Sequence, residues 1–79
     1  MAYKKTNSDR IKRIYQLCED HFGGVRFVGV KYHKKMGWIA KAQFDDGFES
    51  LTADGESDTE ALRNLKNRVK KIIKRYNAV

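Results

Sequence analysis

The spacing of hydrophobic residues changes twice along this 79-residue chain. Over residues 8–22 and again over residues 58–76, apolar side chains recur at intervals of three and four, which places them on one face of an α-helix. The chain between these stretches is rich in β-forming residues and is divided by polar, glycine-containing turns. The pattern predicts the order helix, three strands, helix.

The first helix is expected to begin at Asn7 or Ser8, because either side chain can accept a hydrogen bond from an amide of the first turn. Asp9 then lies in the first turn, where the helix dipole favours a negative charge. The pair Gly23-Gly24 is expected to end the helix, because glycine adopts the left-handed capping conformation at little cost.

The first strand is predicted over residues 25–32 and the second over residues 38–44. In the second strand, alternation separates a face with a lysine and a glutamine from a face that is apolar throughout. The apolar face is expected to form the core and consists of Trp38, Ala40, Ala42 and Phe44.

Asp45-Asp46-Gly47 is typical of a tight hairpin turn, in which the glycine supplies a positive φ. This turn predicts the pairing of the second and third strands. Ala42 is expected to lie opposite Ser50, and Ala40 opposite Thr52.

The last helix is predicted to begin after Ser57, because a serine followed three residues later by Glu60 is a capping box. It is expected to run to about Tyr76. The small side chains on the core face of the sheet leave space for helices to pack closely. We therefore predict an α+β fold of order α-β-β-β-α, with a three-stranded antiparallel sheet and two helices packed on one face.

A chain of this length is expected to form a single domain, residues 1–79, because it buries only about 60–65% of its unfolded surface. Residues 1–7 are predicted to be a flexible, basic lead-in. The single cysteine, Cys18, excludes an internal disulfide, and no run is apolar enough for a signal peptide or a membrane span. These features favour a cytoplasmic protein with no membrane partner.

The formal net charge is +7, and the charges are segregated along the chain. Residues 44–60 contain seven acids and no base, whereas residues 61–79 contain seven bases and no acid. Residues 25–43 carry five more bases and no acid. A polyanion is therefore attracted to most of the chain and repelled by one segment.

No set of residues typical of an enzyme occurs in the sequence. The serines lack a glycine-flanked nucleophile elbow with a histidine–aspartate pair, and the glycines lack a phosphate-binding spacing. Cys18 and His21 lie three residues apart on the first helix, but a structural zinc requires four ligands. We therefore expect no catalytic residue, no metal, no cofactor and no small-molecule substrate.

Gly55, Ser57 and Ala61 match a stretch that recurs at the entry to the last helix of the double-stranded-RNA-binding domain. The chain resembles this family also in the order of its elements over residues 8–76. The resemblance implies the same α-β-β-β-α architecture, with these three residues serving as turn, cap and close contact with the sheet. The lysines by which that family binds phosphates are not matched, since their positions are taken by Asp58, Thr59 and Leu62.

The last helix carries a ridge of cations beside its apolar stripe. At 100° per residue, the members of this basic ridge fall on one side, and three further cations fall on the far side. Such a ridge can follow a phosphate backbone, although a solvated helix face near a C-terminus has the same composition. The basic ridge consists of Arg63, Lys66, Lys70 and Lys74, and the far side carries Arg68, Lys71 and Arg75.

The connection between the first two strands is the second candidate for binding. It combines cations with aromatic rings, which can stack on bases while the charges hold the backbone. Trp38 is alternatively a core residue. The cationic candidates here are Lys31, His33, Lys34 and Lys35, and Tyr32 lies among them.

We therefore expect a small non-enzymatic module that binds RNA or DNA through its phosphates. The alternative is a small inhibitor of phage or mobile-element type, similar to anti-CRISPR proteins, that docks on a nucleic-acid-handling protein. In that alternative the acidic segment occupies a site meant for DNA, or the basic last helix grips an acidic patch of the partner. Turn and cap chemistry alone also accounts for the composition of the acidic segment. The candidate contact residues are Asp45, Asp46 and Glu49.

Overall fold

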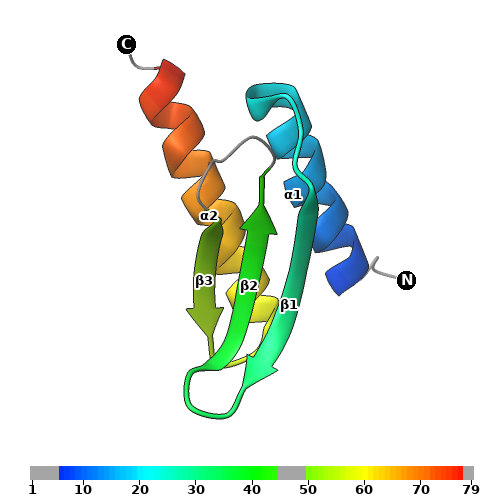
Figure 1. The fold of residues 1–79 in the computed structure, drawn as a ribbon, viewed down its shortest axis with the longest axis vertical. Helices are drawn as coiled ribbons and strands as arrows, with labels where there is room; N and C mark the ends of the chain where they lie inside the picture. Colours follow the sequence, from blue (N-terminus) through cyan, green and yellow to red (C-terminus); the bar gives the residue numbers. More distant parts are fainter. Residues whose placement is uncertain (1–5, 45–49, 78–79) are drawn as a thin grey trace, which may run out of the picture.

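The computed structural model describes residues 6–44 and 50–77 of the chain. Its elements occur in the predicted order, and the α+β class is confirmed (Figure 1). No helix within the described ranges is long and apolar enough to cross a membrane. The elements are helix α1 (Asn7–Phe22), strands β1 (Phe27–His33), β2 (Gly37–Gln43) and β3 (Leu51–Gly55), and helix α2 (Asp58–Asn77).

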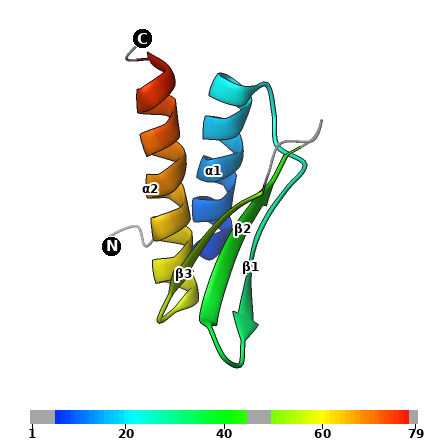
Figure 2. The same ribbon diagram turned by 60° about the vertical axis from the view of Figure 1, so that its left-hand side comes forward.

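The molecule has two layers. The three strands form one antiparallel sheet in the order β1-β2-β3. Both helices cover the same face of this sheet and run in the same direction (Figures 1 and 2). The turn between β1 and β2 extends beyond the helices, at the end of the molecule where both helices begin.

Helix α1 begins one residue earlier than predicted. Its N-cap is Thr6 rather than Asn7 or Ser8. The Thr6 hydroxyl accepts a hydrogen bond of 3.2 Å from the Asp9 N–H, and the Asp9 carboxylate accepts one of 3.1 Å from the Thr6 N–H. This reciprocal pair satisfies two donors at once, which a cap at Asn7 or Ser8 does not offer with Asp9. Thr6 and Asn7, which are expected in the lead-in, thus belong to the start of α1, and residues 1–5 lie outside the described residues.

The predicted end of α1 is confirmed. Gly23 adopts the left-handed conformation with φ 79°, and the Gly24 N–H donates a hydrogen bond of 3.2 Å to the carbonyl of Cys18. These two glycines therefore close the last turn of α1 and turn the chain toward the sheet.

The core face of β2 is the predicted one, with Ala40 and Ala42 fully buried. The predicted register of β3 is wrong by one residue, because Ala42 pairs with Leu51 and Ala40 pairs with Ala53. A shift of one residue exchanges the two faces of a strand. The observed register turns Leu51 and Ala53 toward the core and leaves Ser50 and Thr52 exposed. The turn predicted from Asp45-Asp46-Gly47 lies outside the described residues.

The core lies between the sheet and the helices. Its largest fully buried side chains come from both helices, so neither helix forms it alone. They are Ile14, Cys18, Leu62, Leu65 and Val69.

The entry to α2 is built as its sequence predicts. The Ser57 hydroxyl accepts a hydrogen bond of 3.1 Å from the Glu60 N–H, so the predicted cap is confirmed. A Cβ added to Gly55 would lie 2.6 Å from the Ala61 nitrogen, and Ala61 is fully buried. The end of β3 therefore packs against the backbone of the first turn of α2, which only a glycine permits.

Candidate nucleic-acid interface

The first turns of the two helices are joined by hydrogen bonds. The Asn7 side-chain amide donates one of 2.6 Å to the Asp58 carboxylate, and its carbonyl oxygen accepts one of 3.1 Å from the Thr59 hydroxyl. Because the helices run in the same direction, residues three or four positions further along each helix then lie at the same level. This brings Arg10 of α1 beside Leu62 and Arg63 of α2.

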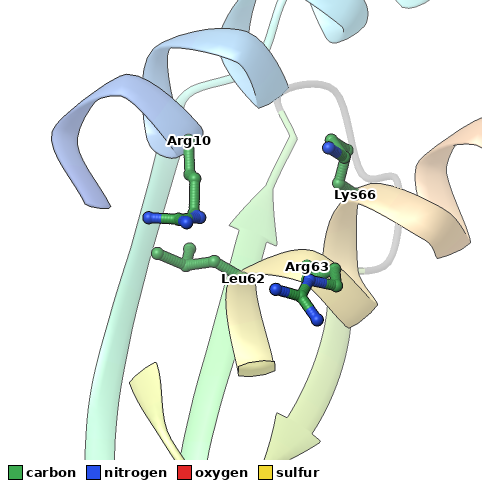
Figure 3. Close-up of a pocket in the computed structure, with 4 residues that line it drawn as sticks. All are labelled: Arg10, Leu62, Arg63 and Lys66. Carbon is green, nitrogen blue, oxygen red and sulfur yellow. The ribbon is translucent and has the colours of Figure 1, made fainter. Parts of the chain in front are cut away.

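A hollow of about 210 Å³ opens between the helices at this level (Figure 3). We call it the basic hollow. Three of its four lining side chains are cations, and they come from both helices. Leu62 is fully buried and supplies the apolar lining. Among residues 6–44 and 50–77 no carboxylate lines the hollow, and its cations are suited to an anion. The lining residues are Arg10, Leu62, Arg63 and Lys66.

The sequence indicates Arg63 and Lys66 but not Arg10. Arg10 lies three residues after Asn7, on the side of α1 that carries the contact with α2, and its guanidinium also donates a hydrogen bond of 3.4 Å to the Asn7 side-chain carbonyl. The sequence contains a cation at this position, but it holds no signal for the alignment of the two helices that places Arg10 in the hollow.

The rest of the basic ridge continues along α2. Lys70 and Lys74 are exposed and lie one and two turns beyond Lys66. From Arg63 to Lys74 the helix rises about 16 Å, which corresponds to about five base-pair steps of a nucleic-acid duplex.

Arg68, on the far side of α2, has a structural contact. Its guanidinium donates a hydrogen bond of 2.8 Å to the carbonyl of Thr52, and Asn64 donates one of 2.8 Å to the carbonyl of Asp54. Both acceptors lie on β3, so this side of α2 is tied to the sheet. Lys71 and Arg75 are exposed.

The structure separates the cations of the β1–β2 region. Lys34 and Lys35 are exposed in the turn, at the end of the molecule where α2 begins (Figure 1). The side chain of His33 accepts a hydrogen bond of 3.2 Å from the Lys35 N–H. Lys31 pairs with Ile39, and strand alternation places it on the face of the sheet away from the helices. The structure therefore brings none of these side chains into the lining of the basic hollow.

The two aromatic residues of this region contact each other. The rings of Tyr32 and Trp38 lie edge to face with centroids 5.4 Å apart. Trp38 is partly buried against the core, whereas Tyr32 is 56% exposed. Only Tyr32 therefore presents most of its ring to a ligand.

The remaining candidates form no site within the described residues. Cys18 is fully buried, and its burial raises the pKa of the thiol to about 11, while His21 is exposed. No group of three histidine, cysteine or carboxylate side chains in residues 6–44 and 50–77 is arranged to hold a metal ion. The acidic candidates Asp45, Asp46 and Glu49 lie outside these ranges.

No family model matches the chain, and comparisons with curated proteins and with solved structures find no match either.

Proposed function

We propose that this protein is a small non-enzymatic module that binds the phosphate backbone of RNA or DNA in the basic hollow and along the basic ridge. The observation that carries the proposal is the convergence of three cations from two helices, Arg10, Arg63 and Lys66, on one hollow. A single surface cation contributes little to affinity. Several cations that neutralise successive phosphates together release counterions, and the affinity then grows with their number.

The chemistry of the hollow supports a phosphate ligand in particular. Two of its cations are arginines, whose planar guanidinium groups match the geometry of phosphate oxygens better than ammonium groups do. Lys70 and Lys74 then provide further charges in the direction in which a backbone would continue along α2.

The architecture is compatible with a double-stranded-RNA-binding domain, and this resemblance makes an RNA duplex the first ligand to test. The chain departs from that family at the first residues of α2, and the structure gives the departing residue another contact. Asp58 stands in place of a lysine, and its carboxylate binds Asn7. We therefore place the phosphates farther along α2, at Arg63 and beyond, rather than at its first residues.

The alternative of an inhibitor that docks on a nucleic-acid-handling protein would use either the basic last helix or the acidic segment. Because Asp45, Asp46 and Glu49 lie outside the described residues, the structure adds no argument for a role of the acidic segment.

The test is a titration of the protein with fluorescently labelled RNA and DNA duplexes of one sequence at two salt concentrations. We expect binding at low salt that weakens steeply as salt is added, with each neutralised phosphate contributing about 0.7–0.9 to the slope of log K against log salt. Absence of binding to both duplexes at low salt would contradict the proposal, as would binding that does not respond to salt.

A further inference from the structure

The two edges of the sheet differ in how they are covered. At the β3 edge, the carbonyls of Thr52 and Asp54 point away from β2 and accept hydrogen bonds of 2.8 Å from Arg68 and Asn64 of α2. Side chains of the last helix therefore occupy acceptors that an additional strand would need. This edge is protected in the way that native sheets commonly protect their edges.

At the β1 edge, the Val28 N–H donates a hydrogen bond of 3.1 Å to the Tyr15 hydroxyl of α1. The backbone N–H of Val28 therefore points away from β2. In an antiparallel ladder, the backbone N–H and carbonyl groups of every second residue point toward the same edge of the strand. The N–H and carbonyl groups of Val30 and Tyr32 therefore also lie along this edge. Among residues 6–44 and 50–77, no side chain forms a hydrogen bond with them.

Large exposed hydrophobic residues gather along the same strand and its turn. Phe27, Tyr32 and Met36 are 50%, 56% and 62% exposed. The Phe27 ring lies over Gly29 on the outer face of the sheet, since a Cβ added to Gly29 would lie 2.5 Å from the ring. Tyr32 lies on the other face, beside Trp38. An incoming strand would thus find an aromatic ring on each side of the ladder.

The charge around this edge is uniformly positive. Residues 25–43 contain no acid, and their cations are exposed. A second copy that paired through its own β1 edge would bring the same positive charge and would be repelled. A nucleic acid lacks the alternating amide and carbonyl groups that continue a ladder. The cations concerned are Arg26, Lys31, Lys34, Lys35 and Lys41.

We propose that the edge of β1 from Val30 to Tyr32 binds an extended, acidic segment of a partner protein, which adds to the sheet as a fourth strand. The ladder hydrogen bonds supply the affinity, and the cations and exposed rings select acidic segments with alternating apolar side chains. The edge and the basic hollow are separate surfaces, so this proposal does not depend on phosphate binding.

The test uses a short acetylated and amidated peptide of alternating glutamate and valine. Binding is followed by NMR, with hydrogen exchange at individual amides of the protein. We expect the amides of Val30 and Tyr32 to become protected from exchange when the peptide binds. The same peptide with N-methyl groups on alternate amides cannot complete the ladder and is expected to bind at least tenfold more weakly. A peptide of alternating lysine and valine is expected not to bind.

A matched pair of proline substitutions assigns the edge. Tyr32→Pro removes an outward N–H that the existing ladder does not use, which edge strands tolerate. We expect it to weaken peptide binding at least tenfold. Thr52→Pro makes the same change at the β3 edge and is expected to leave binding unchanged. If circular dichroism shows that Tyr32→Pro does not fold, Lys31→Glu replaces it and is expected to weaken binding several-fold.

Any one of four results would overturn the proposal. The glutamate–valine peptide does not bind, or it binds equally well to Tyr32→Pro and Thr52→Pro, or it protects β3 rather than β1. Protection of Val30 and Tyr32 without peptide in a protein that sediments as a dimer would identify a second copy as the occupant and would also overturn it.

Discussion

The side-chain amide of Asn7 donates a hydrogen bond of 2.6 Å to the carboxylate of Asp58, a residue 51 positions away in the chain. This contact joins the start of the first helix to the start of the last. It lies at the same end of the helix pair as Arg10 and Arg63, which line the basic hollow.

We expect Asn7→Ala to lower the free energy of unfolding by about 1–3 kcal/mol, because it removes the hydrogen bonds of Asn7 with the Asp58 carboxylate and the Thr59 hydroxyl. The measurement is urea denaturation followed by circular dichroism. Ser8→Ala is the control, since Ser8 is exposed and is not the cap. Equal loss of stability in the two variants would show that the Asn7 contact does not stabilise the fold.

Gly55→Ala is expected to destabilise the protein by about 1–3 kcal/mol. Its Cβ would lie 2.6 Å from the Ala61 nitrogen and 2.9 Å from the Glu60 carbonyl carbon, both of which are backbone atoms. Gly29→Ala is the comparison, because its Cβ meets only the half-exposed ring of Phe27, which can rotate away. Thermal melts of both variants test this, and a larger loss for Gly29→Ala would contradict the packing described here.

The double substitution of Arg63→Gln and Lys66→Gln is expected to lower the affinity for a nucleic-acid duplex and to reduce the salt slope by about 2, one for each lost phosphate contact. The control removes the same charge from the exposed far side of α2, through Lys71→Gln and Arg75→Gln. We expect the control to weaken binding only slightly and to leave the slope nearly unchanged. Equal effects in duplex titrations would show that net charge, rather than the basic hollow, determines binding.

Two cations two positions apart on α2 are expected to differ in role. Arg68→Ala should lower the free energy of unfolding by about 1 kcal/mol, because the carbonyl of Thr52 loses its hydrogen bond. Lys70→Ala should change stability by less than about 0.5 kcal/mol, since Lys70 is exposed, and should weaken duplex binding more than Arg68→Ala does. Denaturation and duplex titration of both variants test this difference in role. A loss of binding without a loss of stability in Arg68→Ala would contradict it.

The ionisation of Cys18 is expected to make stability depend on pH in the alkaline range. Burial raises the pKa of this thiol from 9.0 to about 11. The unfolded chain therefore loses the proton first, so the contribution of Cys18 is fully present below about pH 8 and is lost as the pH rises toward 11. Relative to Cys18→Ala, which cannot ionise, the wild-type protein should lose roughly 2–3 kcal/mol of stability over this range. A difference between the two proteins that stays constant with pH would contradict this.

Much of the fold follows from the sequence because it depends on neighbours within a few positions. The three-and-four spacing of apolar residues identifies both helices, and alternation identifies the buried face of β2 at Ala40 and Ala42. Gly23 marks the end of α1 by its backbone conformation, and Ser57 marks the start of α2 by a local hydrogen bond. The basic ridge also follows from the sequence, since helical geometry alone brings Arg63 and Lys74 to one side of α2.

The remaining features required the tertiary structure, because they depend on which side chain a distant backbone meets. The cap of α1 at Thr6 is an exception, because its reciprocal bond with Asp9 spans only three residues and is local. The register of β3 places Leu51 and Ala53 on the core face, which the alternation of apolar and polar residues over 51–54 also indicates, whereas the turn expected at residues 45–47 indicates the opposite face. The basic hollow is lined by side chains of two helices, and one sheet edge stays open because α2 covers only the other.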